Sequence, residues 1–319
     1  MDAESPAPTY TGQMVATRRG FLVAAAVGGA WAQAPNFTAD VDVVTVLATV
    51  RDRNGAVVKD LTRDDFVLEE AGVPQNIRYF YRELDLPLTI GLLVDTSNSQ
   101  AHVLEPERKA TLTFLERVLR EDRDQALVAH FDVRVEVLQG FTSSRRALEA
   151  ALARLSVPAK LSTLLYDAVR DCSEKSMKKE TGRKAFILLS DGVDFRSKTS
   201  LADAIEYAQR ADTIIYSIFF ADALVPYRPL RSAVLAASRE RGRRVMQRLA
   251  SETGGAYFEV TKNDPIEAIY SRIEDALRNQ YSVGYTPEPR AAAGQYRRIR
   301  LTAKRPGLVV QARTGYYAR

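Results

Sequence analysis

The sequence predicts an α/β fold with a doubly wound, mostly parallel sheet, flanked by a small all-β sandwich. Leu88–Val94 and Arg183–Ser190 are apolar runs with the pattern of strands buried on both faces. Strand and helix patterns alternate from 86 to 279, as a doubly wound sheet requires. Short alternating strand patterns occupy both flanks, 38–84 and 280–319. We therefore expect one α/β domain inserted between two β segments.

Composition and charge agree with a globular chain of this size. The 319 residues suffice for two domains with buried cores, and 46% hydrophobic with 27% charged residues exclude a disordered chain. The net charge of +5, from 45 basic and 40 acidic residues, is modest. The densest basic cluster, Arg239–Arg244, has no interleaved aromatic residues. We interpret it as a solvated helix or loop, not as a nucleic-acid or lipid contact.

Cysteine and histidine are too scarce for several kinds of site. The single cysteine, Cys172, excludes an intramolecular disulfide and a cysteine-based zinc cluster, and its surroundings predict the buried face of a helix. Only two histidines occur, which argues against most histidine-dependent hydrolases and zinc enzymes. We interpret His130 as structural and His102 as a loop residue.

Residues 1–32 have the pattern of an export signal. Thr17-Arg18-Arg19-Gly20-Phe21-Leu22 precedes the apolar run Val23–Ala30, and Ala30-Trp31-Ala32 follows it. This order predicts a twin-arginine signal, with translation starting at Met1 or Met14; an amphipathic helix is the alternative. The apolar run is shorter than the ~20 residues that span a bilayer. We expect an exported, periplasmic or extracellular protein.

The two flanks predict complementary parts of one sandwich. Val41–Val50 is a predicted strand that ends in the turn Asp52-Arg-Asn-Gly55, and Phe66–Glu70 with Gln75–Tyr81 form a predicted hairpin. These strands alone are too few to bury a core. The missing strands are expected in the C-terminal flank, at Tyr281–Tyr285, Tyr296–Ala303 and Leu308–Gly315.

The central part predicts a regular series of elements. One antiparallel edge is expected where a hairpin turns at Asp132. The predicted strands after Leu88–Val94 are Gln125–Phe131, Val133–Leu138, Phe186–Ser190, Thr213–Phe220 and Ala256–Val260. The predicted helices are Glu107–Arg120, Ser144–Arg154, Thr163–Met177, Leu201–Ala211, Val245–Thr253 and Pro265–Arg278.

Small polar residues follow two of the buried strands. Asp95-Thr-Ser97-Asn-Ser99 follows the first, Ser190-Asp191-Gly192 ends another, and Thr163 opens the helix predicted between them. Ligands of open α/β sheets bind at the carboxyl ends of the strands. Oxygen ligands of this type suit Mg²⁺, Mn²⁺ or Ca²⁺. The alternative is that Asp95 and Ser97 only cap the next helix.

The Asp-x-Ser-x-Ser, Thr and Asp-Gly elements, in this order, resemble the metal-ion-dependent adhesion site of von Willebrand factor type A domains. The resemblance implies hydroxyl ligands from Ser97, Ser99 and Thr163, with Asp95 and Asp191 holding the ion directly or through water. It also implies Mg²⁺ as the expected ion, with Mn²⁺ and Ca²⁺ as alternatives. The segment Ala221–Arg244 is expected to be an insertion beside this site.

The resemblance extends to both flanks. Asp60–Phe66 with Gly72-Val-Pro-Gln75, and Arg305-Pro-Gly-Leu308 with Gly315-Tyr-Tyr317, are similar to segments of exported bacterial proteins of the VWFA-related, acidobacterial-type family. One departure concerns the metal site, because Leu161-Ser162 stands where many type A domains have Gly-Gly before the threonine.

These features predict a non-enzymatic, metal-dependent protein-binding module outside the cytoplasm. Its partner is expected to supply an Asp or Glu side chain; neither nucleic acid nor a membrane span is expected. Two alternatives remain open, a metal-free scaffold of a cell-envelope assembly and a hydrolase that uses Asp95 or Asp191 at a metal. The chain shows no Ser-His-Asp order and no Gly-x-Ser-x-Gly elbow, which speaks against the hydrolase.

Overall fold

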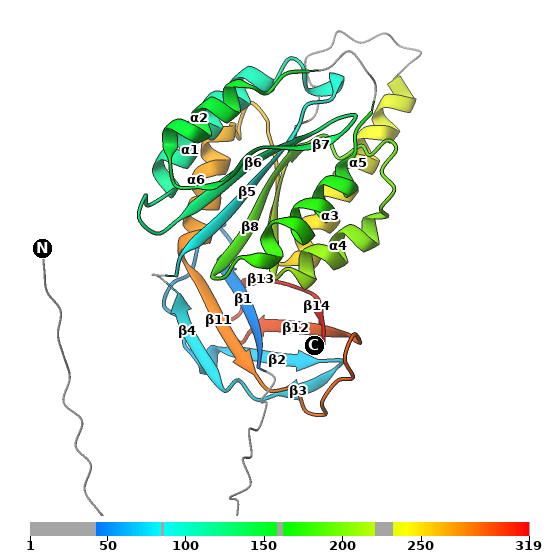
Figure 1. Ribbon diagram of the computed structural model, residues 1–319. Coiled ribbons are helices and arrows are strands. Elements are labelled where there is room, and N and C mark those ends of the chain that lie inside the picture. The colour runs from blue at the N-terminus through cyan, green and yellow to red at the C-terminus, as the bar shows by residue number, and fades with distance from the viewer. Residues whose placement is uncertain (1–42, 84–85, 158–161, 221–231, 319) are drawn as a thin grey trace, which may run out of the picture. The chain divides into compact units, whose positions relative to one another are not determined.

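The computed structural model describes residues 43–83, 86–157, 162–220 and 232–318 (Figure 1). The predicted export signal, the alternative start at Met14 and the first part of the expected insertion, 221–231, lie outside the described residues. Within these ranges, no helix combines the length and apolarity needed to cross a bilayer.

The centre of the fold is a six-stranded sheet in the order β10-β9-β8-β5-β6-β7. All neighbours are parallel except β6 and β7, so the predicted doubly wound sheet with one antiparallel edge strand is confirmed. β5 and β8 are buried along their whole length, which is why their sequences are continuous apolar runs. The strands are β5 (Leu88–Asp95), β6 (Gln125–Phe131), β7 (Val135–Thr142), β8 (Arg183–Ser190), β9 (Thr213–Phe219) and β10 (Tyr257–Glu259).

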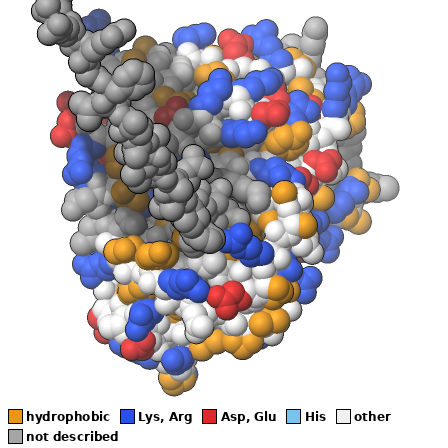
Figure 2. Space-filling view, turned by 60° about the horizontal axis from the view of Figure 1, so that its bottom comes forward, with side chains coloured by type: hydrophobic (Ala, Val, Ile, Leu, Met, Phe, Trp, Pro, Cys, Tyr) orange, Lys and Arg blue, Asp and Glu red, His pale blue; other side chains and the backbone are white. Residues whose placement is uncertain are grey.

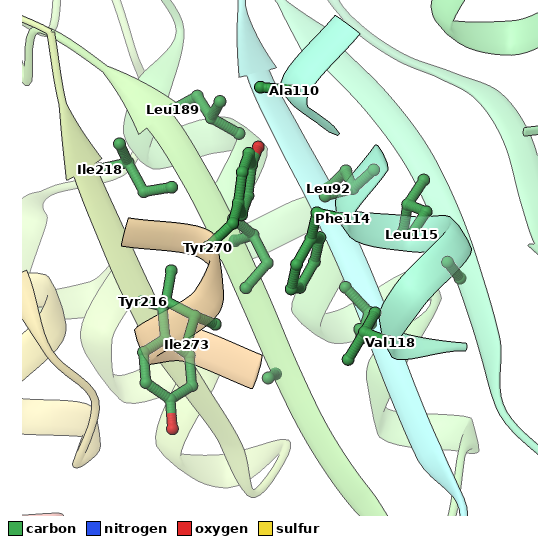
Figure 3. Packing of buried hydrophobic residues seen from close by; sticks show 14 of the residues in the cluster. Leu92, Ala110, Phe114, Leu115, Val118, Leu189, Tyr216, Ile218, Tyr270 and Ile273 are labelled. Carbon is green, nitrogen blue, oxygen red and sulfur yellow. The ribbon is translucent and has the colours of Figure 1, made fainter. Parts of the chain in front are cut away.

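Helices cover both faces of this sheet (Figure 1), and among the described residues three pack against each face. One face packs against α1 (Leu104–Val118), α2 (Arg145–Ala153) and α6 (Ile266–Arg278), and the other against α3 (Leu165–Lys175), α4 (Leu201–Arg210) and α5 (Ser232–Thr253). On the first face, Phe114 of α1 stacks on Tyr270 of α6 with ring centroids 4.5 Å apart, beside Leu92 of β5 (Figure 3). Short 3₁₀ helices span Arg63–Asp65, Asn98–Gln100 and Met177–Lys179.

Helix α5 differs most from the sequence-based expectation. The prediction placed an insertion up to Arg244 and a helix from Val245, but one helix runs from Ser232 to Thr253. Strong helix formers such as Ala, Arg and Glu explain its length, and its arginines hide the apolar periodicity. Arg243 is also paired along the helix with Glu240, at 2.7 Å.

The two flanks build a pair of antiparallel sheets with one shared core, as predicted. Their orders are β13-β1-β11-β4 and β14-β12-β2-β3, so each sheet combines strands from before and after the central part. Val46 and Tyr281 of the first sheet and Leu68 and Ile299 of the second belong to the same buried cluster. The strands are β1 (Val44–Arg51), β2 (Phe66–Glu70), β3 (Val73–Gln75), β4 (Tyr79–Glu83), β11 (Gln280–Tyr285), β12 (Tyr296–Ala303), β13 (Val309–Ala312) and β14 (Gly315–Tyr317).

Two turns of the N-terminal flank differ in detail from the prediction. The predicted second strand of the hairpin is divided, because β3 pairs with β2 while β4 joins the other sheet beside β11. The turn at Asp52 forms, with Gly55 donating to the Asp52 carbonyl oxygen over 3.0 Å, but only an isolated bridge between Arg51 and Val57 follows it.

On the face shown in Figure 2, Lys and Arg side chains are dispersed among acidic and hydrophobic ones.

Asp124 holds several segments together at the amino ends of the central strands. Its carboxylate accepts hydrogen bonds from Leu88 N at 2.9 Å, Arg120 Nε at 3.1 Å and Arg278 Nη2 at 2.6 Å. Burial by itself raises the pKa of Asp124, but the hydrogen bonds from these arginines and from the backbone outweigh it and lower the pKa to about 2. The end of α6 is thereby joined to the beginning of β5.

Candidate metal centre

The site begins where adjacent parallel strands end. In the register of the sheet, Val94 of β5 pairs with Leu189 of β8, and Asp95 pairs with Phe131 of β6. The carboxyl ends of three strands therefore lie side by side. Side chains that follow them are brought to one edge, although 36 to 95 residues of sequence separate their strands.

Asp95 is fully buried at this edge, and both of its oxygens are fixed. Oδ1 accepts a hydrogen bond from Ser97 N at 2.9 Å, and Oδ2 accepts one from Ser190 Oγ at 2.6 Å. Ser190 Oγ in turn accepts from Gly192 N at 3.0 Å. Burial and the charge of Asp191 raise the pKa of Asp95 to about 7. Ser190 was not among the predicted site residues.

The serines of the polar loop lie next to one another and reach the second aspartate. Ser97 Oγ lies 3.0 Å from Ser99 Oγ, and Gln100 Nε2 donates to Ser99 Oγ at 3.4 Å. Ser99 and Gln100 also hydrogen-bond Asp191, although burial raises the pKa of this carboxyl. Ser99 is exposed and Asp191 is partly exposed, so the cluster opens to solvent on this side.

Thr163 lies in an extended segment before α3, not in the first turn of a helix as predicted. Its N–H donates to the Phe195 carbonyl oxygen at 3.1 Å, and Phe195 N donates back at 2.8 Å. The next residue, Leu164, donates to the carbonyl oxygen of Asp132 at 3.2 Å. Thr163 is thus joined to the cluster through neighbouring segments, whereas Asp95, Ser97, Ser99 and Asp191 form one interacting group.

A hydrogen bond between Thr96 and Asp132 joins the polar loop to the turn between β6 and β7, and sequence reasoning missed both residues. Thr96 Oγ1 donates to Asp132 Oδ2 at 2.8 Å and lies 2.9 Å from His130 Nδ1. All three side chains are buried. The sequence signal that could have pointed to Asp132 is its position between two strands that form a hairpin. His130 supports the polar loop, in keeping with its structural interpretation.

The loop that carries Asp191 is fixed to the first turn of α3. Asp194 Oδ1 accepts from Tyr166 N at 3.2 Å, and Asp167 Oδ1 accepts from Thr199 N at 3.0 Å. These bonds fix the loop on both sides of Phe195, the residue that pairs with Thr163. Aspartate side chains that accept hydrogen bonds from backbone N–H groups explain the conformation of this loop.

Helix α5 crosses the Asp191–Gly192 turn at very short range. A Cβ atom built on Gly242 would lie 2.0 Å from the carbonyl oxygen of Asp191, and one on Gly192, where φ is +71°, would lie 2.3 Å from the Gly242 carbonyl oxygen. Only glycine permits this approach. The basic cluster Arg239–Arg244 therefore contains a packing residue of the candidate centre.

A third buried carboxyl group, that of Glu107, is affected by the charge of Asp95. Glu107 of α1 is 2% exposed, and neither of its oxygens has a hydrogen-bond partner within the described residues. Burial and the charge of Asp95 raise the pKa of Glu107 well above its usual range. Sequence reasoning missed this burial, because Glu107 was expected at the start of an amphipathic helix.

The donor set fits a hard divalent cation. Asp95 and Asp191 form no salt bridge with a basic side chain in the described part of the chain, so their negative charges are uncompensated there. Gln100 Oε1 is buried without a partner among the same residues. No group of three or more His, Cys, Asp or Glu in these ranges has metal-binding geometry. The candidate centre thus combines two carboxylates with neutral hydroxyls.

Comparison with known proteins identifies the fold. No family model and no curated protein sequence matches the chain. Among solved structures, proximal thread matrix protein 1 from the mussel byssus matches with a TM-score of 0.50 and 14% identity, over 65% of this chain and 50% of that chain. A second structure of that protein, with a zinc-occupied MIDAS motif, matches with a TM-score of 0.50 and 15% identity over the same shares.

A von Willebrand factor type A protein from Catenulispora acidiphila aligns with 87% of this chain and 74% of its own, with a TM-score of 0.49 and 12% identity. The chain spans half the length of the mussel protein, and identities this low concern the fold alone. Together with the sheet order and the six covering helices, the match to the mussel protein shows that the chain has the fold of a von Willebrand factor type A domain.

Proposed function

We propose that this protein is a non-enzymatic, divalent-cation-dependent protein-binding module that acts outside the cytoplasm. The cation is held by Asp95, Ser97, Ser99, Thr163 and Asp191. The observation that carries the proposal is the pair Asp95 and Asp191, which lie close together beside two hydroxyls with no basic partner in the described residues. Burial and, after it, the charge of Asp191 raise the pKa of Asp95, and a cation between the two carboxylates would offset both effects.

The surrounding residues orient the ligands. Ser190 and the Ser97 N–H hold the two oxygens of Asp95, while Ser99 and Gln100 hold Asp191. Mg²⁺ is the expected ion, because oxygen donors of this kind suit hard cations. When bound, it supplies an open coordination position for a carboxylate of a partner protein. Such a contact is stronger than an exposed ion pair, which contributes about 0–1 kcal/mol.

Two further observations support this proposal. Ser99 and Asp191 are the solvent-accessible members of the cluster, so a partner side chain can approach from that side. The mussel protein of similar fold has been observed with zinc in its MIDAS motif.

Export is proposed from the arginine pair and apolar run within residues 17–32.

Calorimetric titration of the purified chain with Mg²⁺, Mn²⁺, Ca²⁺ and Zn²⁺ tests the metal centre. We expect saturable binding at one site, abolished in Asp95→Ala and unchanged in Asp64→Asn, a control whose side chain is 84% exposed. A pull-down from cell-envelope extract, with and without chelator, then tests partner binding. Capture that chelator and Asp95→Ala both abolish supports the proposal.

The same experiments separate the two alternatives. Absence of cation binding, with partner capture unaffected by Asp95→Ala, indicates a metal-free scaffold instead. Turnover of phosphate or carboxylate esters that depends on added Mg²⁺ or Mn²⁺ and on Asp95 or Asp191 indicates a hydrolase.

A further inference from the structure

Thr163 is the one proposed ligand that stands outside the interacting group of the other four. Those four interact with one another, whereas the backbone N–H and carbonyl oxygen of Thr163 are both bonded to Phe195, at 3.1 and 2.8 Å. One cation can engage both parts only if the distance between them is fixed. A residue that contacts both parts is therefore important for the centre.

Asp132, in the turn between β6 and β7, is bonded to both parts. Its Oδ2 accepts a hydrogen bond from Thr96 Oγ1 at 2.8 Å, and Thr96 directly follows Asp95 in the polar loop. Its carbonyl oxygen accepts one from Leu164 N at 3.2 Å, directly after Thr163. Asp132 is 3% exposed, so water does not compete for these bonds. One buried residue thus connects the polar loop with the Thr163 segment.

The turn holds Asp132 in this position. Its Oδ1 accepts hydrogen bonds from Val133 N and from Arg134 N, the latter at 3.3 Å, and its own N–H donates to the Arg134 carbonyl oxygen at 3.1 Å. Oδ1 is thereby engaged within the turn, and Oδ2 faces the polar loop. A separate backbone bond, from Thr96 N to the Phe131 carbonyl oxygen at 3.1 Å, attaches the loop to the end of β6.

The Thr96 hydroxyl serves as donor in this connection. It gives its only proton to Asp132, so towards His130 Nδ1, 2.9 Å away, Thr96 Oγ1 can only accept. The ring of His130 therefore carries a proton on Nδ1. A serine can replace this hydroxyl, whereas a valine has the same shape as threonine but offers neither a donor nor an acceptor.

We propose that Asp132 is a positioning residue of the cation centre: through its bonds to the polar loop and to the Thr163 segment, it sets the distance between them and so favours Mg²⁺ over Ca²⁺. This inference rests on the proposed function. Mg²⁺ requires a near-ideal octahedron of oxygens at about 2.0–2.1 Å, whereas Ca²⁺ accepts about 2.3–2.6 Å and variable geometry. A polar loop that is free to shift therefore loses more affinity for Mg²⁺ than for Ca²⁺.

Thr96→Val tests the proposal, because it keeps the shape of the side chain and removes the donor to Asp132. We expect the calorimetric Kd for Mg²⁺ to rise about tenfold and that for Ca²⁺ to rise less than about threefold. Thr96→Ser keeps the hydroxyl and should bind both cations within about twofold of the wild type. The backbone bond to Phe131 does not depend on this side chain, and retained Ca²⁺ binding shows that the valine variant is folded.

Thr111→Val is the matched control. It removes a similarly buried hydroxyl that lies 2.6 Å from Tyr270 Oη, between α1 and α6. Both valine variants should lower the melting temperature of the chelator-treated protein, because each removes a buried hydrogen bond. Only Thr96→Val should change the ratio of the Kd values for Mg²⁺ and Ca²⁺.

The outcomes separate this inference from the proposed function. A wild type that binds none of the four cations overturns both together. A wild type that binds a cation without preferring Mg²⁺ to Ca²⁺, or whose preference Thr96→Val leaves unchanged, overturns the inference alone. The same holds if Thr111→Val changes the preference equally, since the effect then follows general stability, or if Thr96→Ser binds as weakly as Thr96→Val.

Discussion

Ser190 Oγ donates a hydrogen bond to Asp95 Oδ2 over 2.6 Å and so joins the last residues of two adjacent strands that are 95 positions apart in the sequence. Because Asp95 is fully buried, this bond selects the orientation of its carboxylate. The remaining oxygen, Oδ1, is held by the Ser97 N–H. The geometry of the candidate centre therefore depends on a serine outside the set of proposed ligands.

Replacement of Ser190 by alanine should weaken cation binding. A hydrogen bond to a charged group contributes about 1.5–3 kcal/mol, so we expect the Kd for Mg²⁺ to rise about tenfold or more. Calorimetric titration measures this change, and Ser251→Ala on the exposed side of α5 serves as the control. An unchanged Kd in Ser190→Ala means that the bond does not orient Asp95.

Gly242→Ala should disturb the centre from the helix side. Its Cβ atom would lie 2.0 Å from the Asp191 carbonyl oxygen, so either α5 or the Asp191 turn has to move. We expect a loss of about 1–3 kcal/mol in the free energy of unfolding, measured with urea, together with weaker Mg²⁺ binding.

Gly140→Ala in β7 is the matched control for this variant, because no atom lies within 4 Å of the added methyl group. Its stability and Mg²⁺ affinity should stay close to those of the wild type. Equal behaviour of the two glycine variants would contradict the contact between α5 and the Asp191 turn.

The cation-free protein should lose stability between about pH 4 and pH 7 through Asp95. Burial and the charge of Asp191 raise the pKa of Asp95 from 3.8 to about 7, so in this window the folded state binds more protons than the unfolded state. Stability therefore falls as pH rises through the window. Urea unfolding with chelator should show this fall, and Asp95→Asn should reduce it.

Saturating Mg²⁺ provides the complementary measurement. A bound cation favours the ionised form of Asp95, so the contribution of Asp95 to the fall with pH should disappear when Mg²⁺ is present. The proposed centre predicts a difference between the chelator and Mg²⁺ curves that grows with pH. Parallel curves would exclude a cation at Asp95.

Asp124 should show the opposite pH dependence. Burial opposes ionisation, but hydrogen bonds from Arg120 and Arg278 lower the pKa of Asp124 to about 2, so its contribution is full above 3.8 and lost as pH falls towards 2. We expect Asp124→Asn to cost about 3 kcal/mol at pH 7, measured by urea unfolding. The difference from the wild type should shrink below pH 4, whereas a constant difference would contradict the assignment.

The sequence by itself determined the alternation of strands and helices, the buried strands and the place of the polar loops. Leu88–Val94 is apolar throughout because both faces of β5 are covered, and this pattern is local and visible in the sequence. The places of Asp95, Ser97, Ser99 and Asp191 at the carboxyl ends of β5 and β8 were visible in the sequence, because these residues end or closely follow buried apolar runs; their role as cation ligands stays a prediction. The strand patterns in both flanks likewise predicted the paired sheets that they form.

Only the tertiary structure decided which side chains support these residues. Ser190 faces Asp95, Gly242 contacts the Asp191 turn, and the extended segment at Thr163 pairs with Phe195. Glu107 is buried because α1 packs this side of the helix inward. Each of these contacts joins segments far apart in the sequence, and local periodicity carries no information about them because they follow from how helices and strands pack.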